Sequence, residues 1–299
     1  MSVQKTLRRS TTCAGIGLHS GSKVTLSLRP APADFGIRFR RADLGGLEVP
    51  ATADHVGGIN YATGLSRDAV NVDTVEHLLA ALVSMNIDNV IVELNSPEVP
   101  IMDGSAAPFI YLIQEAGVRA LNAPRKFLKV LRPITLSRGD KRIALYPSDH
   151  FKVTYSIAYD HPLLRHQSRT MRITESSFVE EIAAARTFTF LKEVEQLRKQ
   201  GLALGGSLEN AIVVGDTGVL NHALRFDDEF VRHKILDVIG DMALLGHPII
   251  GHLVAHRGGH GLHTAFAAQV LEERDAWTLV EGPAAKDALA PAAQPVTAN

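Results

Sequence analysis

Three polar residues recur every four positions in the strongly apolar segment 230–241. In a helix, His233, Asp237 and Asp241 would lie one turn apart on one face. We expect a helix rich in Ile, Leu and Val to be buried, and a buried carboxylate is costly unless it is paired or bound to a metal. An imidazole and a carboxylate at i and i+4 form half of a metal site. The stripe therefore makes His233 and Asp237 candidate metal ligands.

A second apolar segment, residues 74–82, opens with the adjacent pair Glu76 and His77. Alone this pair is ordinary, because a first-turn glutamate complements the helix dipole and a single histidine is usually structural. With His233 and Asp237, however, His77 would complete a set of three ligands. Three protein ligands and one open position are typical of catalytic zinc, whose bound water loses its proton near neutral pH. Glu76, about 100° round the helix from His77, is the natural general base.

A glycine-rich turn, residues 257–263, contains His260. Its glycines predict a tight or positive-φ backbone that presents the imidazole instead of burying it. A histidine is the usual general acid for protonating an amine leaving group near neutral pH, and Asp241 could orient it. The alternatives are a solvent-exposed turn histidine and a simple salt bridge of Asp241 on the helix face.

The composition limits the classes of protein and of metal site. The chain has 299 residues, 45% hydrophobic and 21% charged, with a formal net charge of −1, as in ordinary globular proteins. This charge predicts no binding to nucleic acid. Cys13 is the only cysteine, which excludes an intrachain disulfide and a cysteine-based zinc cluster, and predicts a cytoplasmic protein. A metal here must be held by His, Asp or Glu.

The N-terminal segment and the known nucleotide motifs add further limits. No apolar run has the length of a membrane span, and no signal-peptide core is present. The first 33 residues lack Asp and Glu, as in an organellar transit peptide, but residues 23–28 alternate like a folded strand. P-loop, dinucleotide-binding and serine-esterase motifs are missing, so those chemistries have no support.

The chain repeats its own plan in two halves. Each half begins with two strand patterns joined by a proline-bearing turn, at residues 24–28 and 35–39 and again at 143–146 and 151–157. Each half then continues with a helix, a turn and a further strand. The helices are predicted over residues 74–85 and 229–245, and the strands over 90–94 and 249–254. The shared order of these patterns indicates a duplication.

These patterns predict an α+β fold of two similar domains, each a small sheet with helices packed on one face. Asp73 or Thr74 is placed to cap the first helix. His77 and His233 lie early in their helices, so an active site at the domain interface would bring them together. The predicted domains are residues 1–123 and 124–281, and residues 282–299, rich in Ala and Pro, are predicted to be a disordered tail.

Several motifs follow one another in the order found in a known enzyme family. They are residues 15–21 (GIGLHSG), 28–32 (LRPAP), 74–78 (TVEHL), 100–109 (PIMDGSAAPF), 185–188 (ARTF) and 230–234 (FVRHK). Carrying these motifs, the chain from residue 4 to residue 277 closely resembles the UDP-3-O-acyl-N-acetylglucosamine deacetylase family, zinc amidases of lipid A biosynthesis in Gram-negative bacteria. The family fold, two similar α+β domains with the active site between them, agrees with the repeat.

The resemblance implies a role for each member of the candidate metal site. His77, His233 and Asp237 would bind Zn²⁺, with Fe²⁺ as the other ion that suits these ligands, and Glu76 would be the general base. One departure is visible at Ala62, where some relatives carry a cysteine close to the metal. Alanine offers no thiolate, so any metal behaviour that depends on that cysteine should be absent here.

The resemblance also implies roles for the residues that surround the reacting amide. His260 would be the general acid and would stabilise the oxyanion, positioned by Asp241. Thr187 would hydrogen-bond the developing oxyanion, and Lys234 would lie near the polar head of the substrate. A catalytic acid separate from the base is chemically sensible, because an amide nitrogen leaves poorly unless it is protonated.

Further residues are assigned to substrate binding on the same basis. Phe188 and the segment 202–207, including Gly206, would belong to the substrate passage and its apolar channel for the acyl chain. Tyr155 matches an aromatic residue at the uridine end, and His19 lies in the first of the shared motifs. No obligate protein partner and no integral membrane segment are predicted.

The implied reaction is hydrolysis of the 2-acetamido group of UDP-3-O-(hydroxyacyl)-N-acetylglucosamine to acetate and the free amine, the committed step of lipid A biosynthesis. Two other classes share parts of the pattern. A non-haem iron(II) oxygenase also uses two histidines and a carboxylate, although an adjacent glutamate base and a distant histidine acid suit hydrolysis better. A non-catalytic sugar-nucleotide binding protein could carry His and Asp residues that merely satisfy one another.

Overall fold

The computed structural model describes residues 2–58 and 61–282. The predicted disordered tail therefore lies outside the described residues, apart from Gly282. That residue is buried and donates its N–H to the carbonyl of Arg125 at 3.1 Å, so it belongs to the folded part and not to the tail.

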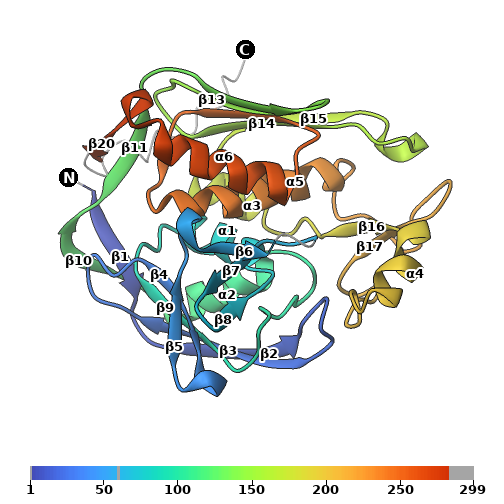
Figure 1. The fold of residues 1–299 in the computed structure, drawn as a ribbon, viewed down its shortest axis with the longest axis horizontal. Coiled ribbons are helices and arrows are strands. Elements are labelled where there is room, and N and C mark those ends of the chain that lie inside the picture. Colours follow the sequence, from blue (N-terminus) through green and yellow to red (C-terminus); the bar gives the residue numbers. More distant parts are fainter. Residues whose placement is uncertain (1, 59–60, 283–299) are drawn as a thin grey trace, which may run out of the picture.

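Two five-stranded sheets with the same topology form the frame of the molecule (Figure 1). In each sheet four neighbouring pairs are antiparallel, antiparallel, parallel and antiparallel, in that order. The first sheet contains β2 (Thr11–Ile16), β3 (Lys23–Pro30), β9 (Val90–Leu94), β4 (Ile37–Arg41) and β5 (Leu47–Pro50). The second contains β12 (Ile134–Arg138), β13 (Lys141–Tyr146), β19 (His252–His256), β14 (Lys152–Ile157) and β15 (Gln167–Arg172).

Four helices lie between these two sheets, so that the layers run sheet, helices, helices, sheet (Figure 1). In each half one helix precedes the central strand of the sheet, β9 or β19, and another helix follows that strand. They are α1 (Glu76–Ser84), α2 (Ala107–Ala116), α5 (Glu229–Met242) and α6 (His260–Glu272). The α+β class and the two similar halves are thus confirmed.

Each half is closed by a pairing between its first and last strands. In the first half these strands are β1 (Val3–Leu7) and β10 (Val118–Pro124), and in the second β11 (Lys126–Val130) and β20 (Trp277–Glu281). The short β18 (Ile249–Ile250) pairs with β11 on its other side. A single residue, Arg125, separates β10 from β11. We therefore propose two domains that each close on themselves and meet at Arg125, because Pro124 still pairs with Val3 of the first half, one residue beyond the predicted end at residue 123.

The remaining elements are additions to this common plan. The first half adds a small sheet, and the second adds an arm of two parallel strands with a helix between them. The small sheet contains β6 (Val56–Gly58), β7 (Gly64–Arg67) and β8 (Val70–Val72). The arm contains β16 (Phe188–Phe190), α4 (Leu191–Lys199) and β17 (Ile212–Val214), and a further helix, α3 (Glu175–Glu181), precedes it. Short 3₁₀ turns complete the chain at Ala42–Leu44, Ala53–His55, Pro162–Leu164, Ala243–Leu245 and Arg274–Ala276.

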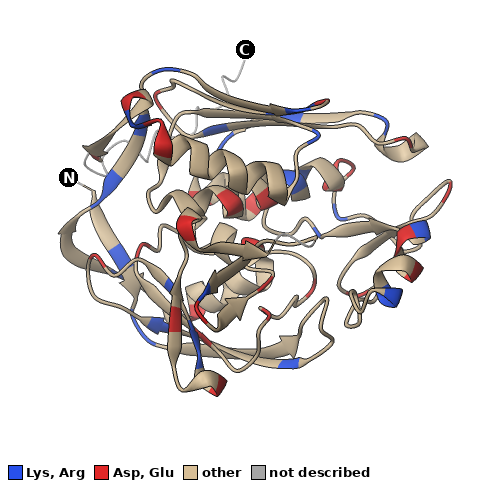
Figure 2. Cartoon of the chain, viewed as in Figure 1, with Lys and Arg blue, Asp and Glu red and all other residues tan. Residues whose placement is uncertain are grey.

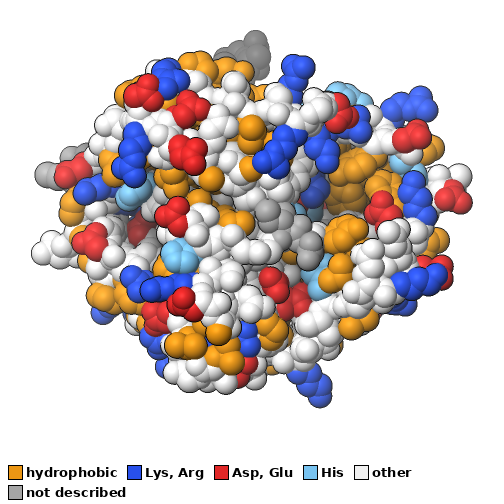
Figure 3. Space-filling view, in the orientation of Figure 1, with side chains coloured by type: hydrophobic (Ala, Val, Ile, Leu, Met, Phe, Trp, Pro, Cys, Tyr) orange, Lys and Arg blue, Asp and Glu red, His pale blue; other side chains and the backbone are white. Residues whose placement is uncertain are grey.

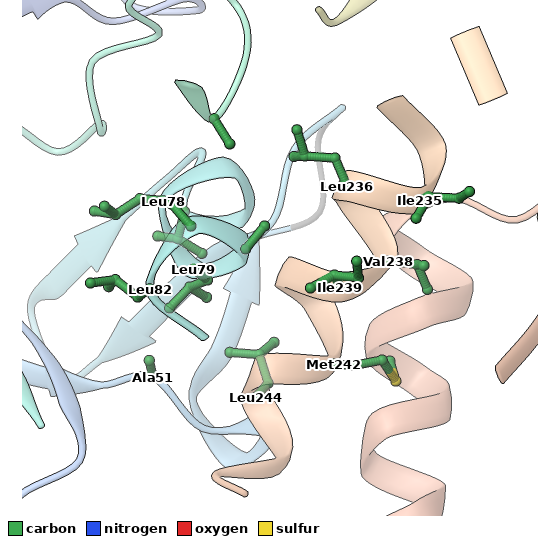
Figure 4. Packing of buried hydrophobic residues seen from close by; sticks show 14 of the residues in the cluster. Ala51, Leu78, Leu79, Leu82, Ile235, Leu236, Val238, Ile239, Met242 and Leu244 are labelled. Atoms are coloured by element: carbon green, nitrogen blue, oxygen red, sulfur yellow. The ribbon is translucent and has the colours of Figure 1, made fainter. Parts of the chain in front are cut away.

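Helices α1 and α5 pack directly on each other in the centre of the molecule. Figure 4 shows Leu78, Leu79 and Leu82 of α1 beside apolar side chains of α5, including Ile239. The contact is close because Gly240 has no side chain: a Cβ at this position would lie 2.1 Å from the carbonyl oxygen of Glu76. Burial on all sides explains why both helices are apolar around most of their circumference.

The start of α1 differs from the sequence-based prediction. Neither Asp73 nor Thr74 is the N-cap, which is Val75, and no side chain of the described chain caps this helix. Thr74 has a positive φ of 60°, and its hydroxyl donates to Glu98 Oε1 at 3.1 Å. The chain therefore enters α1 through a left-handed residue held by a distant carboxylate, an arrangement that capping statistics cannot predict.

Charged side chains are distributed as the composition predicts. Over the face in Figure 3, Lys and Arg are interspersed with Asp and Glu, in keeping with a formal net charge of −1. Figure 2 shows acidic residues on α5 in the interior, between the two sheets. Among residues 2–58 and 61–282, no helix is long and apolar enough to cross a membrane.

One buried ion pair ties the segment after α3 to the start of α5. The Glu229 carboxylate is fully buried and accepts hydrogen bonds from the backbone N–H of Arg186 at 3.0 Å, from its Nε at 2.8 Å and from its Nη2 at 3.1 Å. The backbone N–H of Arg225 donates to the same carboxylate at 2.6 Å. This pair fixes the position of the strand residues that follow Arg186.

We expect Glu229→Ala to lower the free energy of unfolding by about 3–5 kcal/mol, because it leaves a buried guanidinium without its carboxylate. Urea unfolding followed by circular dichroism measures this change. The matched control is Glu193→Ala on the exposed side of α4, which should change the free energy by less than about 0.5 kcal/mol. Equal midpoints for Glu229→Ala and the wild type would contradict the role of the pair.

Candidate metal centre and active site

The predicted ligands His77, His233 and Asp237 converge where α1 meets α5. Asp237 Oδ1 lies 3.1 Å from His233 Nε2 and 3.5 Å from His77 Nε2, and the three side chains are almost fully buried. One ligand atom from each residue lies within 4.8 Å of the others. The i, i+4 spacing on α5 brings His233 and Asp237 together, and the close packing at Gly240 brings in His77.

The polar atoms of this cluster fit a metal ion. Asp237 Oδ1 is buried and has no hydrogen-bond partner among the described residues, which is costly unless a cation binds there. Two ligands about 2.0–2.1 Å from a tetrahedral zinc ion lie about 3.3 Å apart, close to the separations of Oδ1 from the two imidazoles. The set therefore suits a divalent metal bound by two nitrogens and one oxygen.

Neighbouring groups orient two of the ligands. His233 Nδ1 lies 3.1 Å from the carbonyl oxygen of Ala185, so its N–H can donate there and leave Nε2 free for a metal. Lys234 Nζ donates to Asp237 Oδ2 at 2.7 Å, which leaves only Oδ1 without a partner. Lys234 thus touches a ligand as well as lining the pocket at the site.

Glu76 lies beside the ligands and is placed to act as a base. Its Oε2 accepts the backbone N–H of Thr63 at 3.0 Å, and its Oε1 is 3.8 Å from His260 Nε2. Burial raises the pKa of the Glu76 carboxyl above its ordinary value, and His260 and His77 only partly oppose that effect. A carboxylate with a raised pKa is a better proton acceptor near neutral pH.

His260 lies beside the other oxygen of Glu76 and is held in place by Asp241 and Thr63, whose hydroxyl is 3.2 Å from His260 Nδ1. This Nδ1 donates to Asp241 Oδ2 at 2.9 Å, and the Nε2 of His260 lies 3.8 Å from Glu76 Oε1 and 3.9 Å from Asp237 Oδ2. Burial disfavours the charged imidazole, but Asp241 and Glu76 outweigh burial and raise the pKa of His260 to about 9. A raised pKa favours the protonated ring at neutral pH, which is the form that can donate a proton.

The groups open onto a pocket of about 560 Å³. Of the residues predicted to act on the substrate, Thr187, Phe188, Lys234 and His19 line it. Ala62, where some relatives carry a cysteine, lines it too. Thr187 is positioned by its backbone, because its N–H donates to the carbonyl of Gly104 at 2.8 Å and its carbonyl accepts from Ile212 at 2.8 Å.

Two residues predicted to bind substrate are elsewhere. Tyr155 is fully buried, and its hydroxyl lies 3.0 Å from His263 Nε2, so it cannot touch a ligand in the pocket. The prediction of contact with a uridine end is wrong for this residue. Gly206 is not among the described residues that line the pocket. A Cβ at Gly206 would be 3.6 Å from the side chain of Leu18, which does line the pocket.

The glycine-rich turn before α6 also differs from expectation. Residue 257, an arginine, has the positive φ, whereas Gly259 is extended and His260 is the first residue of α6. Gly258 is required for space, because a Cβ there would lie 2.6 Å from His263 Nε2. The imidazole of His260 is presented by the start of a helix, with 12% of its side chain exposed.

Other residues of the site were not predicted. His263 lies on the same face of α6 as His260, three residues later, a spacing that could have revealed it. Glu98 accepts the N–H groups of His19 and Ser20, both at 2.8 Å, and so holds the loop that forms one wall of the pocket. Thr63 connects two carboxylates of the site, because its backbone N–H donates to Glu76 and its hydroxyl donates to Asp241.

Comparisons with known proteins agree with this geometry. A family model described as UDP-3-O-acyl N-acetylglycosamine deacetylase matches residues 4–272. Three relatives are named UDP-3-O-acyl-N-acetylglucosamine deacetylase. The protein of Pseudomonas entomophila is 51% identical over 281 residues, 93% of each chain. That of Hahella chejuensis is 48% identical over 281 residues, also 93% of each chain. That of Alcanivorax borkumensis is 46% identical over 299 residues, 99% of this chain and 98% of its own. Because these matches span nearly the whole of both sequences, the chain belongs to the UDP-3-O-acyl-N-acetylglucosamine deacetylase family.

Proposed function

We propose that this chain hydrolyses the 2-acetamido group of UDP-3-O-(hydroxyacyl)-N-acetylglucosamine, giving acetate and UDP-3-O-(hydroxyacyl)-glucosamine in lipid A biosynthesis. The observation that carries the proposal is the placement of a base and an acid beside one cluster of candidate ligands. His260 Nε2 is 3.8 Å from Glu76 Oε1 and 3.9 Å from Asp237 Oδ2. An oxygenase needs no such pair, and a binding protein would not need to leave Asp237 Oδ1 without a partner.

We propose Zn²⁺ as the metal held by His77, His233 and Asp237, with Fe²⁺ suiting the same nitrogen and oxygen donors. When bound, such an ion would polarise the amide carbonyl and lower the pKa of a water molecule. The protein supplies the proton acceptor: Glu76, steadied by the N–H of Thr63, takes the proton of the attacking water.

His260 acts at the other end of the reaction. As a cation it stabilises the negative charge that develops on the carbonyl oxygen, together with the hydroxyl of Thr187 at the pocket wall. It then transfers its Nε2 proton to the departing amine nitrogen. Asp241 stays ionised behind the ring and keeps Nδ1 protonated, so the proton that leaves comes from the atom that faces the pocket.

The rest of the substrate extends away from these groups. We propose that Lys234 and His19 lie near the polar head, since both line the pocket, and that the acyl chain runs along Phe188 and the β16–β17 arm. Leu204 and Leu191 of that arm are 55% and 50% exposed, which provides apolar surface for a lipid chain. We also propose a cytoplasmic location, because a chain with a single cysteine cannot form the intrachain disulfides that are common in exported proteins.

A coupled assay for acetate tests the proposed function directly. The purified protein is incubated with the acylated UDP-sugar, then with a chelator, and then with added Zn²⁺. We expect acetate release that the chelator abolishes and zinc restores. A wild-type protein that binds the UDP-sugar but releases no acetate under all three conditions would refute the proposal in favour of a binding protein.

The protonation states predict a bell-shaped pH dependence of kcat/KM. Glu76 works only when ionised, so activity falls as the pH drops through its raised pKa. His260 works only when protonated, so activity also falls as the pH rises through about 9. Asp241→Asn removes the charge that most raises the pKa of His260, and so it should move the alkaline limb to lower pH. An alkaline limb that stays in place in this variant would contradict the assignment of His260.

A further inference from the structure

We propose that His263 and Tyr155 are positioning residues for the reaction, which hold Asp241 in the one orientation that aims His260 at the leaving nitrogen. This inference rests on the proposed deacetylation, in which His260 is the acid. It gives Tyr155 a role behind the site, in place of the substrate contact that its burial excludes.

The Asp241 carboxylate is fully buried and is oriented by three donors. Thr63 Oγ1 donates to Oδ1 at 2.5 Å, while His260 Nδ1 and His263 Nδ1 donate to Oδ2 at 2.9 and 2.8 Å. Oδ2 is therefore shared between the proposed acid and a second imidazole one turn further along α6. Without His263, Oδ2 loses one of its two donors, and the carboxylate can turn away from His260.

The second imidazole is itself anchored to the sheet. His263 and Tyr155 are both fully buried, and the tyrosine hydroxyl lies 3.0 Å from His263 Nε2. The backbone makes room for this contact, because a Cβ at Gly258 would lie 2.8 Å from the hydroxyl and 2.6 Å from Nε2. Tyr155 thus connects β14 to α6, and through Asp241 to α5.

The hydrogen bonds also select one tautomer of His263. An ionised Asp241 only accepts, so the hydrogen of His263 must be on Nδ1. Burial lowers the pKa of His263, which keeps the ring neutral, and its Nε2 must then accept the hydroxyl proton of Tyr155. Burial also raises the pKa of Tyr155 well above its ordinary value, so the phenol stays a donor. The tyrosine therefore keeps the donor of His263 facing Asp241.

Four variants of the metal-loaded enzyme test the proposal by their kcat and KM for acetate release. His263→Leu removes the donor and should lower kcat about tenfold or more, with KM within about twofold of wild type. The double variant His263→Asn with Tyr155→Phe should recover most of kcat. The asparagine Nδ2 can donate to Asp241 in place of the imidazole Nδ1, and Tyr155→Phe removes the tyrosine hydroxyl, which would otherwise lose its acceptor on residue 263. Tyr155→Phe alone should lower kcat by a smaller factor. Phe266→Leu, a fully buried apolar residue of α6, is the control for lost packing and should leave kcat unchanged.

The outcomes separate the alternatives. A folded His263→Leu enzyme with wild-type kcat overturns the proposal. So does a double variant whose kcat is as low as that of His263→Leu, because packing alone would then explain the loss. If His263→Leu fails to fold, the comparison of Tyr155→Phe with Phe266→Leu decides, and equal kcat values overturn the proposal. Wild-type protein that releases no acetate instead refutes the proposed function.

Discussion

Replacement of Glu76 by glutamine should lower kcat by about 10²–10⁴-fold, the usual contribution of a general base. The amide keeps the size of the carboxylate and can still accept the N–H of Thr63, but it cannot take a proton from water. The metal content and KM should stay near wild type, because Glu76 is not one of the proposed ligands. Steady-state rates of acetate release, with metal analysis of the same samples, measure both quantities.

Glu93→Gln is the matched control for this change. Glu93 is on β9, is not among the described residues that line the pocket, and pairs with Arg29, whose side chain is 47% exposed. Its conversion to an amide should leave kcat unchanged, because exposed ion pairs contribute little. A Glu76→Gln enzyme that kept more than a tenth of the wild-type kcat would assign the base to another group.

Asp237→Asn should release the metal. The substitution removes the negative charge from the one buried carboxylate oxygen that has no other partner among the described residues, and it leaves Lys234 without its carboxylate. Loss of a residue that only supports a ligand lowers metal affinity by roughly 10–100-fold, and loss of the ligand Asp237 should lower it further. We expect kcat to fall in proportion to the fraction of enzyme that still holds the metal. Titration of the metal-free protein with Zn²⁺, followed by calorimetry, gives the affinity directly.

Asp241→Asn is the closest available control, since this buried carboxylate lies one turn further along the same helix. Its oxygens are occupied by Thr63, His260 and His263. We therefore expect it to keep the metal with a reduced but measurable activity. Equal zinc affinity for Asp237→Asn and the wild type would show that the ligands lie elsewhere.

The parts of the site that the sequence could predict are those in which helix geometry acts locally. The spacing of His233, Asp237 and Asp241 identifies one face of α5, whatever that helix packs against. The match between the two halves then pairs His233 with His77, because duplicated units place equivalent positions on equivalent elements. The two sheets have the same strand order, and this repetition is what made the prediction possible.

The parts that could not be predicted depend on contacts between distant segments. Thr63 and Asp241 are 178 residues apart, and Tyr155 and His263 are 108 apart. Tyr155 alternates with polar neighbours in β14 as any core tyrosine would, so its sequence gives no sign of which histidine it meets. The left-handed Thr74 likewise depends on Glu98, a residue 24 positions away.

The division of the ligands between the two helices has a consequence for folding. His77 belongs to the first half of the chain and His233 to the second, so a metal bound to both closes a loop of roughly 156 residues, as a disulfide would. A cross-link over so long a loop removes much of the freedom of the unfolded chain, and a ligand that binds only the folded state adds its binding free energy to stability. The ion would then act as a reversible cross-link between the two halves. Loss of the metal would weaken the association of the halves as well as stop the reaction.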